Sequence, residues 1–333
     1  MLRRGLVGVL LLAACRGDTC PPGWKPLFER AELNRPILAL WGQGREVWMV
    51  GGPAGAAGLT TLIEHWDGAA WSERPRAGTE TLWWVWGTPD GAEVWMVGER
   101  GLVLRARGGA IETLASGTGA TLYGVWGTSP SDVSVVGGTP NAGTAQPNDV
   151  VLQYTGAAFQ AATGPPPKGV AFFKVWGAAA DDFWIVGEGG TAWRRTAAGW
   201  EDHSVELLTR ESVTTVHGCA GDDVWAVAGP NVFHWGGARW GPADGAHPAS
   251  AANGVFCGPD GVLVVGNGGL KLRWVRATSS WSDDSLAAPY YADFHAAWIA
   301  PGGTEWATGG NYNAPASEPR VGIAAIYGCP VPR

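Results

Sequence analysis

The stretch VWGTPDGAEVWMVGERGLVLR, from Val85 to Arg105, returns in outline about ninety residues later as VWGAAADDFWIVGEGGTAWRR, from Val175 to Arg195. In both copies an apolar run ending in Trp-Gly is followed by a turn, by a second apolar run that ends in glycine, and by a third run. Short apolar runs between glycine-containing turns predict short antiparallel β-strands. The repetition indicates that the fold is built from copies of this unit.

Aligning the whole chain on this motif gives seven units with a spacing of roughly forty residues. The third run is followed across a glycine turn by another aromatic residue, as in LIEHWDGAAW from Leu62 to Trp71, which predicts a fourth strand. Units of this length are typical of propeller blades. The sequence therefore predicts an all-β, seven-bladed β-propeller of four-stranded antiparallel blades. Its anchor residues are predicted to be Trp41, Trp86, Trp126, Trp176, His217, Cys257 and Trp298.

Composition agrees with this architecture. The chain has 52 glycines and 21 tryptophans but only 16% charged residues, which indicates tight turns around large buried rings rather than long amphipathic helices. We expect the anchor tryptophans to fill the space between neighbouring sheets. A row of stacking platforms for sugars is the alternative.

The net charge limits the classes of partner. It is −7, and removing a leader that carries Arg3 and Arg4 takes away two positive charges and leaves −9. This acidity disfavours nucleic acid and anionic headgroups. We expect a protein or a glycan as partner, and contact with a membrane only through a lipid anchor.

The repeat resembles a known group of sequences. The run DVWAV at 223–227, the glycine-rich turns and WDGAAW at 66–71 resemble the tryptophan-rich propeller repeats of secreted bacterial proteins. They are similar to repeats of photosystem II assembly factors and of the sialidase-like Asp-box (BNR) group, although HWDGAAWSE at 65–73 lacks the serine of that box. The resemblance spans Pro36 to Tyr327 and implies the fold more than a function.

The first residues predict export. MLRRGLVGVLLLAAC has two arginines, an apolar stretch and a cysteine after small residues, as in a secretory signal peptide. Residues 12–15 resemble the lipobox of bacterial lipoproteins, which implies cleavage before Cys15 and acyl chains on its sulfur. Arg16 follows the cysteine, where an aspartate would be the usual signal for retention at the inner membrane, so the resemblance implies the outer membrane. The expected organisation is a signal peptide at 1–14, a lipidated tether at 15–19 and the propeller at 20–333. An ordinary signal peptide with an incidental Cys15 is the alternative.

Four further cysteines predict two disulfides, because an even number in an exported chain favours pairing. Cys219 and Cys257 fall near the same end of neighbouring inner strands and are predicted to pair. Cys20 would then pair with Cys329. The segment CPPGWKPLF from Cys20 reads as the fourth strand that the last unit lacks, so the N-terminal strand would complete the last blade and leave no open edge. Free thiols are the alternative.

The longest loops are expected on one face, because second-to-third and fourth-to-first connections emerge on the same side of a four-stranded blade. Loops on a rigid ring often carry binding residues. The candidates supply amide and hydroxyl groups beside aromatic faces, which suits carbohydrate or peptide; they are Asn141, Asn148, Asn311, Tyr312, Asn313, Tyr290, Tyr291 and His203. Ordinary exposed-loop chemistry is the alternative reading. Near the axis, Trp84 and Lys174 are predicted to line a channel.

Sequence motifs for catalysis are lacking. The six histidines form no HxH or HxxxH pair, and no CxxC occurs, so we predict neither a metal site nor a cofactor. No nucleophile elbow or phosphate loop is found. We therefore expect a non-enzymatic binding or scaffold module, lipid-anchored at the bacterial cell envelope. The alternatives are a glycan-binding or glycan-hydrolysing protein of the sialidase-like group and an envelope assembly factor.

Overall fold

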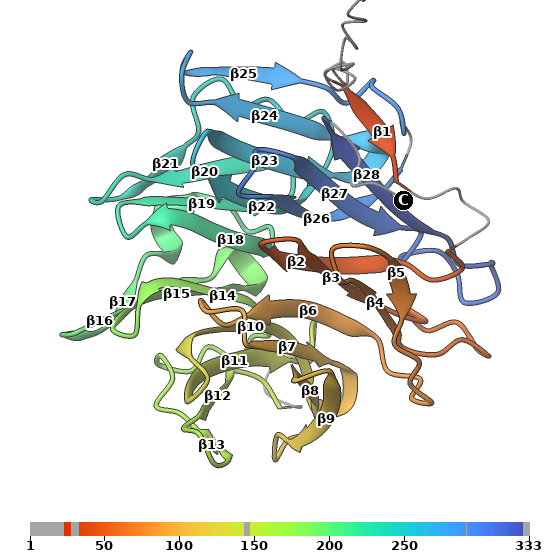
Figure 1. Ribbon diagram of the computed structural model, residues 1–333. Helices are drawn as coiled ribbons and strands as arrows, with labels where there is room; N and C mark the ends of the chain where they lie inside the picture. The colour runs from red at the N-terminus through yellow and green to blue at the C-terminus, as the bar shows by residue number, and fades with distance from the viewer. Residues whose placement is uncertain (1–22, 28–32, 143–146, 291, 329–333) are drawn as a thin grey trace, which may run out of the picture.

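Seven four-stranded antiparallel sheets surround a common axis in the computed structural model, which describes residues 23–27, 33–142, 147–290 and 292–328 (Figure 1). The predicted seven-bladed propeller is confirmed. The first strands of neighbouring blades lie side by side around the axis, including β2 (Ile37–Gln43) with β26 (Phe294–Ile299), so the ring is closed. Within the described ranges, no helix is both long enough and apolar enough to cross a membrane.

Blades 1 to 4 follow one another along the chain. Blade 1 is β2, β3 (Glu46–Gly51), β4 (Leu62–Trp66) and β5 (Trp71–Glu73); blade 2 is β6 (Leu82–Gly87), β7 (Glu93–Gly98), β8 (Leu102–Arg107) and β9 (Ala110–Ala115). Blade 3 is β10 (Thr121–Ser129), β11 (Asp132–Gly138), β12 (Val150–Tyr154) and β13 (Phe159–Ala161); blade 4 is β14 (Phe172–Ala179), β15 (Asp182–Gly187), β16 (Ala192–Thr196) and β17 (Gly199–Asp202).

Blades 5 to 7 complete the ring. Blade 5 is β18 (Val213–Ala220), β19 (Asp223–Ala228), β20 (Asn231–Trp235) and β21 (Trp240–Pro242); blade 6 is β22 (Ala252–Gly258), β23 (Gly261–Gly266), β24 (Lys271–Val275) and β25 (Ser280–Asp283). Blade 7 contains β26, β27 (Glu305–Gly310), β28 (Gly322–Tyr327) and, outermost, β1 (Trp24–Pro26). Short 3₁₀ turns occur at η1 (Glu99–Gly101), η3 (Glu188–Gly190), η4 (Ser204–Leu207) and η5 (Asn267–Gly269).

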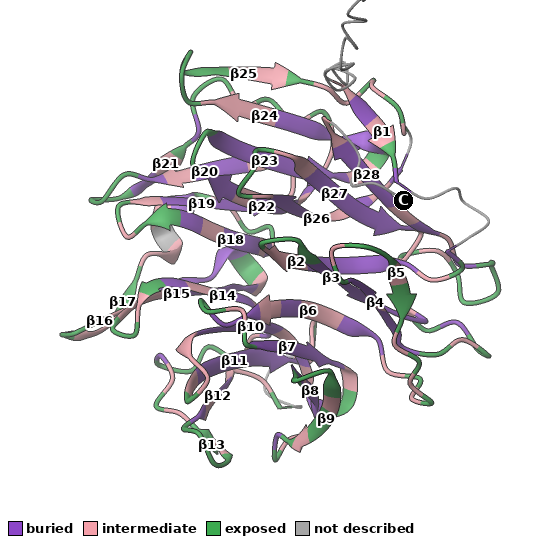
Figure 2. Cartoon of the chain, in the orientation of Figure 1, coloured by how far each residue is buried: buried purple, intermediate pink, exposed green. Residues whose placement is uncertain are grey.

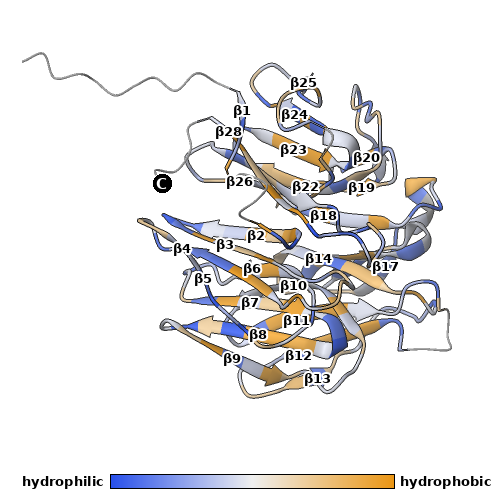
Figure 3. Ribbon diagram, turned by 90° about the vertical axis from the view of Figure 1, so that its right-hand side faces the viewer, coloured by the Kyte–Doolittle hydropathy of each residue, from blue (hydrophilic) through white to orange (hydrophobic). Residues whose placement is uncertain are grey.

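The two ends of the described chain meet in blade 7. Strand β1 pairs antiparallel with β28, with Trp24 opposite Tyr327 and Pro26 opposite Ala325. Figures 1 and 3 both show β1 beside β28. Trp24 is buried, and its indole N–H donates to the Asp284 carboxylate of blade 6 at 3.1 Å. Cys15, Cys20 and Cys329, and with them the signal peptide, the tether and the predicted Cys20–Cys329 disulfide, lie outside the described residues.

The core is divided among the gaps between blades. Each of the seven hydrophobic clusters combines side chains of two neighbouring blades, and one of them joins blade 7 to blade 1. Burial is greatest in the inner strands, whereas outer strands such as β9 and β13 are largely exposed (Figure 2). The inner strands β22 and β23 are mostly buried and contain ribbon segments coloured as hydrophobic (Figure 3). Successive residues of a strand point to opposite faces of its sheet, and both faces of the inner strands are apolar. Each blade therefore packs against the blades on its two sides.

The anchor tryptophans pack between blades, as expected. A Cβ at Gly87 would lie 2.2 Å from the Trp41 ring, and one at Gly218 would lie 2.3 Å from Trp176. At these interfaces the motif glycine of one blade leaves a gap for the anchor ring of the preceding blade. The same contact joins Trp126 to Gly177 and Trp298 to Gly42.

The anchor assigned to unit six is corrected by the strand register. Trp86 pairs with Trp95 in blade 2, and the equivalent pair in blade 6 is Phe256 with Leu263. Cys257 pairs with Val262 and takes the place of the motif glycine. The structure therefore gives an anchor ring, defined by one side chain from each blade: Trp41, Trp86, Trp126, Trp176, His217, Phe256 and Trp298.

Every innermost strand contains an irregularity three residues before its anchor. In blade 2 the register passes from Leu82 directly to Trp84, so Trp83 has no partner on β7. Such a bulge redirects a side chain and changes the local twist. The equivalent bulge residues of the seven blades are Leu38, Trp83, Tyr123, Phe173, Thr214, Asn253 and His295.

Candidate binding site

Two cavities lie on the axis and open on opposite faces. The loop face carries the second-to-third and fourth-to-first connections, and the turn face carries the others. The loop-face cavity has a volume of about 230 Å³ and is lined by Trp83, Tyr123, Pro140, Phe173, Lys174, Thr214 and His295. The turn-face cavity has a volume of about 410 Å³ and contains the anchor ring.

The two cavities are separated by Trp84 and Lys174. These side chains belong to a layer in which the other blades place Ala39, Gly124, Thr215, Gly254 and Ala296. Lys174 Nζ lies 3.6 Å from the centroid of the Trp84 ring and donates to the Tyr123 carbonyl oxygen at 3.1 Å. Small residues elsewhere in the layer leave room for these two large ones.

The sequence position of Lys174 suggested a residue that lines a water-filled channel, but its side chain is buried. Its exposed fraction is only 3%, and burial holds its pKa well below the usual lysine value. Both predicted channel residues are at the axis, but together they form a partition. The amine stacks on the Trp84 indole, where its protonated form would gain a cation–π interaction.

The loop-face cavity is bordered by a continuous row of aromatic rings. Trp83 and Tyr123 have ring centroids 5.3 Å apart, and Tyr123 meets Phe173 edge-on at 5.3 Å. On the other side Trp83 lies 5.9 Å from His295, which meets Tyr312 at 5.1 Å. The row joins four bulge residues to one long loop.

The titratable groups of this row are uncharged near neutral pH. Burial raises the pKa of Tyr123 to about 12 and lowers that of His295 to about 3. The pKa of Tyr312 is also raised by burial. His295 Nδ1 contacts the Leu38 carbonyl oxygen, so this nitrogen carries the proton. The row offers ring faces and edges without a formal charge.

The long loops of blades 1 and 7 are joined by one arginine. The Arg320 side chain is 5% exposed and donates to the carbonyl oxygens of Pro53 and Ala54 in the blade 1 loop. It also donates to the carbonyl oxygens of Asn311 and Ala314 in its own loop, at 3.0 and 2.7 Å. The two loops therefore form one fixed wall on the loop face.

The loop of blade 3 is fixed from blade 4. The Glu188 carboxylate accepts the backbone N–H groups of Asn141 and Ala171, at 2.6 and 2.7 Å. Asn148 accepts the N–H of Thr139 at 2.7 Å and donates to the Gly169 carbonyl oxygen at 3.2 Å. These contacts hold the loop whose Pro140 reaches the cavity.

The predicted loop residues thus divide into two groups. Tyr312 belongs to the aromatic row, and its hydroxyl accepts a hydrogen bond from the Asn253 amide Nδ2 at 3.0 Å and is also hydrogen-bonded with the Asn313 side chain. Asn141, Asn148 and Asn311 chiefly order their own loops, Asn311 through Pro319 and Val321.

The remaining candidates are His203, Tyr290 and Tyr291. His203 bonds to Glu206 at 2.9 Å and packs against Trp184 and Trp235 between blades 4 and 5. Tyr290 is 55% exposed. Tyr291 lies outside the described residues.

Sequence reasoning missed the bulge residues that make most of the cavity. The signal was present, because the residue three before the anchor is aromatic in blades 2, 3 and 4 and is histidine in blade 7. This signal is missed when side chains are assumed to alternate regularly between the two faces of a strand, because that assumption does not direct the residue three before the anchor toward the axis.

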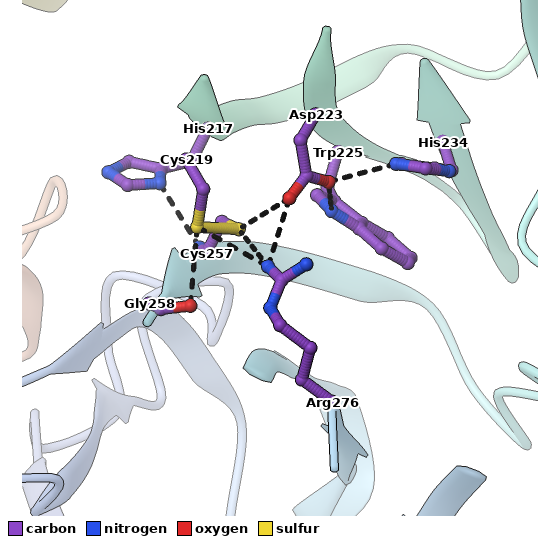
Figure 4. Close-up of a disulfide and its surroundings, with 8 residues drawn as sticks. All are labelled: His217, Cys219, Asp223, Trp225, His234, Cys257, Gly258 and Arg276. Carbon is purple, nitrogen blue, oxygen red and sulfur yellow. Dashed lines mark hydrogen bonds and ion pairs between the residues drawn. A yellow bond between two sulfur atoms is a disulfide. The ribbon is translucent and has the colours of Figure 1, made fainter. Parts of the chain in front are cut away.

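A disulfide borders the turn-face cavity. Cys219 of β18 and Cys257 of β22 are bonded to each other and join blades 5 and 6, as predicted (Figure 4). Arg276 points toward both sulfurs and pairs with Asp223 at 2.9 Å. Among the described residues, Cys219, Asp223 and Cys257 are close enough together to suggest a metal site, but the disulfide removes both thiolates as ligands.

No protein-family model matches the chain, and no curated protein is similar to it in sequence. In structure it is similar to YCF48 bound to D1 peptide, with 15% identity, a TM-score of 0.65 and coverage of 92% of this chain and 97% of that one. It is also similar to YCF48 from Cyanidioschyzon merolae, with 12% identity, a TM-score of 0.64 and coverage of 92% of this chain and 99% of that one. A third similar structure is that of the RRP9 WD40 repeats, with 12% identity, a TM-score of 0.66 and coverage of 94% of this chain and 100% of that one. These likenesses show a propeller fold. The resemblance to bacterial lipoprotein and Asp-box repeats stays a prediction.

Proposed function

We propose that this chain is a non-enzymatic protein-binding module whose loop face holds an extended segment of a partner, with one apolar side chain of that segment in the loop-face cavity. The aromatic row from Phe173 to Tyr312 is the observation that carries the proposal. Aromatic side chains at a concave site supply most of the binding energy in many protein interfaces.

The geometry of the loops supports this role. The wall fixed by Arg320 and the blade 3 loop fixed by Glu188 stand beside the same cavity, so little ordering is required when a ligand binds. The propeller of YCF48, similar in fold, has been solved bound to D1 peptide. That complex supports a peptide as the kind of ligand to test first.

A protein segment fits the lining better than a sugar does. The cavity is bordered by Trp83, Tyr123, Phe173, Pro140 and His295, which present mainly carbon surface. Sugars need several hydrogen bonds in addition to stacking, because their buried hydroxyls must be paired. The glycan-binding or glycan-hydrolysing alternative would need a denser set of polar groups here.

The place of action is part of the proposal and rests on the first fifteen residues. Their resemblance to a lipobox supports export, acylation of Cys15 and anchoring at the outer membrane of a bacterial envelope. A scaffold or assembly role at the envelope would use the same loop face. Metabolic labelling with an alkynyl fatty acid, compared between the wild type and Cys15→Ser, tests the anchor.

The binding role is tested by selecting peptides from a random displayed library on the chain. We expect the selected peptides to share an apolar residue and to lose more than tenfold in affinity for Trp83→Ala. The matched control is Trp86→Ala, which alters the turn face and should retain the affinity. Peptides that bind Trp83→Ala as tightly as the wild type would contradict the proposed site.

A glycan and peptidoglycan array on the same variants tests the alternative. Binding that is lost in Trp83→Ala would favour a lectin-like module over a peptide-binding one. Hydrolysis of an array member would reject the non-enzymatic role.

A further inference from the structure

The turn-face cavity is a second enclosed space that the proposed function does not use. Its volume of about 410 Å³ lies in the range of small-molecule sites, roughly 300 to 1,000 Å³. Trp84 closes it toward the centre, and Pro259 and Pro301 stand in the turns at its mouth. The turn between β22 and β23 is short, so it does not cover the opening.

The rings around this cavity are fixed before any ligand arrives. Trp41 and Trp176 each lie over the motif glycine of the next blade, within 2.2 to 2.3 Å of the position that a Cβ would take. His217 stacks on Phe256 with centroids 4.0 Å apart and an interplanar angle of 26°. A ligand would therefore meet rings that have little freedom left to lose.

The lining of the cavity carries no charge among the described residues. The nearest basic group on the axis, the Lys174 amine, lies against Trp84, whose indole separates it from this space. A charged ligand would lose its hydration here without gaining a partner of opposite charge. The lining therefore favours an uncharged ligand.

His217 offers a directed hydrogen-bond donor within this mostly apolar lining. His217 Nδ1 accepts the backbone N–H of Cys257 at 3.1 Å, which places the imidazole proton on Nε2. Burial lowers the pKa of His217 to about 3, so the ring is neutral at physiological pH. Within the described part of the chain no hydrogen bond to Nε2 occurs, and Figure 4 shows this nitrogen on the side of the ring away from Cys257.

We propose that the turn-face cavity binds an uncharged ring compound that carries a hydrogen-bond acceptor. The ring lies among the anchor tryptophans, and the acceptor receives the Nε2–H of His217. This site is independent of the loop face, so the protein has two binding sites separated by Trp84 and Lys174.

Calorimetric titration of the full chain tests the ligand class with four naphthalene probes. They are 2-naphthalenemethanol, its oxygen-free analogue 2-methylnaphthalene, the anion 2-naphthoate and the cation 2-naphthylmethylammonium. We expect the alcohol to bind at least tenfold more tightly than either ion. Equal affinity for an ion, or no binding of the alcohol, would overturn the proposal without need of any variant.

Variants then test the donor. His217→Phe keeps a stacking ring and removes the N–H, so we expect about a tenfold loss for the alcohol and no change for 2-methylnaphthalene. His217→Gln keeps a neutral donor and should retain part of the affinity for the alcohol. Equal losses for both probes in His217→Phe would mean that the ring only supports packing, and would overturn the role of Nε2.

Phe173→Leu separates the two sites. This substitution alters the loop face and should leave naphthalene binding unchanged while weakening the selected peptides. If Phe173→Leu weakens the alcohol as much as His217→Phe does, the probe occupies the loop-face cavity and the turn-face site is rejected. Failure of peptide selection alone would leave the naphthalene result standing.

Discussion

His217 and His295 are two imidazoles that the fold keeps neutral, one at each axial cavity. Burial lowers the pKa of each to about 3, below the ordinary value of 6.5. In the unfolded chain both histidines bind protons near pH 6.5, whereas in the folded chain they bind them only near pH 3. Between these values the unfolded state holds more protons, so stability decreases as the pH falls.

We predict that the free energy of unfolding decreases on acidification below pH 6.5, with a slope of up to about 1.4 kcal/mol per pH unit from each histidine. His295→Phe should have a shallower slope by one such contribution. The measurement is chemical denaturation monitored by fluorescence at pH 6.5, 5.5 and 4.5. His247→Asn, at an exposed histidine, is the control for the loss of an imidazole. Identical slopes in the wild type and His295→Phe would contradict burial of this ring.

At the scale of the strand, the motif glycines decide how closely blades approach. Gly87 lies at the end of β6, where a Cβ would come within 2.2 to 2.5 Å of three atoms of the Trp41 ring. The contact leaves no room for a methyl group, and the indole is held by both sheets. Accommodation would require the two blades to move apart.

We predict that Gly87→Ala lowers the free energy of unfolding by about 1 to 3 kcal/mol, as overpacking does in well-filled cores. Gly241→Ala is the matched control, because Gly241 is also in a strand and has no atom within 4 Å of an added Cβ. Thermal and denaturant unfolding of both variants provide the comparison. Equal stability of the two variants would show that the Trp41 interface is loosely packed.

The strand scale also explains which features the sequence could predict. The seven blades were predictable because Trp41, Trp86 and their equivalents recur with a constant period, and each recurrence has the same neighbour to pack against. The aromatic row was not predictable, because a bulge shifts the alternation of side chains between the two faces of a strand by one residue. Trp83 and His295 lie at such bulges and are thereby redirected toward the axis. The alternation of apolar and polar residues in the sequence does not show at which residue a strand has its bulge.

The misplaced anchor of blade 6 has a related cause. Cys257 stands beside Phe256, and the two possible alignments of VFCG differ by one residue. Only the pairing of Phe256 with Leu263 distinguishes them. The disulfide with Cys219 was nevertheless predictable, because either alignment places Cys257 at the same end of its strand.

For the whole molecule, stability depends on a short seam between the two ends of the chain. Strand β1 has only three residues, yet Trp24 is buried against blade 6 and meets Tyr327 with ring centroids 5.8 Å apart. Without β1, strand β28 would expose its backbone N–H and C=O groups along one edge.

We predict that Trp24→Ala lowers the free energy of unfolding by about 3 to 5 kcal/mol, as for other buried tryptophans. It should also increase self-association, since the edge of β28 becomes accessible. Pro26→Ala, at the exposed end of the same strand, is the control. Denaturant unfolding and light scattering test both effects. Unchanged stability of Trp24→Ala would mean that β1 contributes little to ring closure.

The pairing of β1 with β28 also ties closure of the ring to the order of protein synthesis. A ribosome makes β1 before β28, so the earlier strand waits without its partner until the intervening blades and β28 have been translated. A chain that stops before β28 cannot close blade 7 and retains an unpaired strand edge that chaperones and proteases can recognise. Translation through β28 hides that edge, and the seam thereby distinguishes chains that include β28 from chains that stop before it.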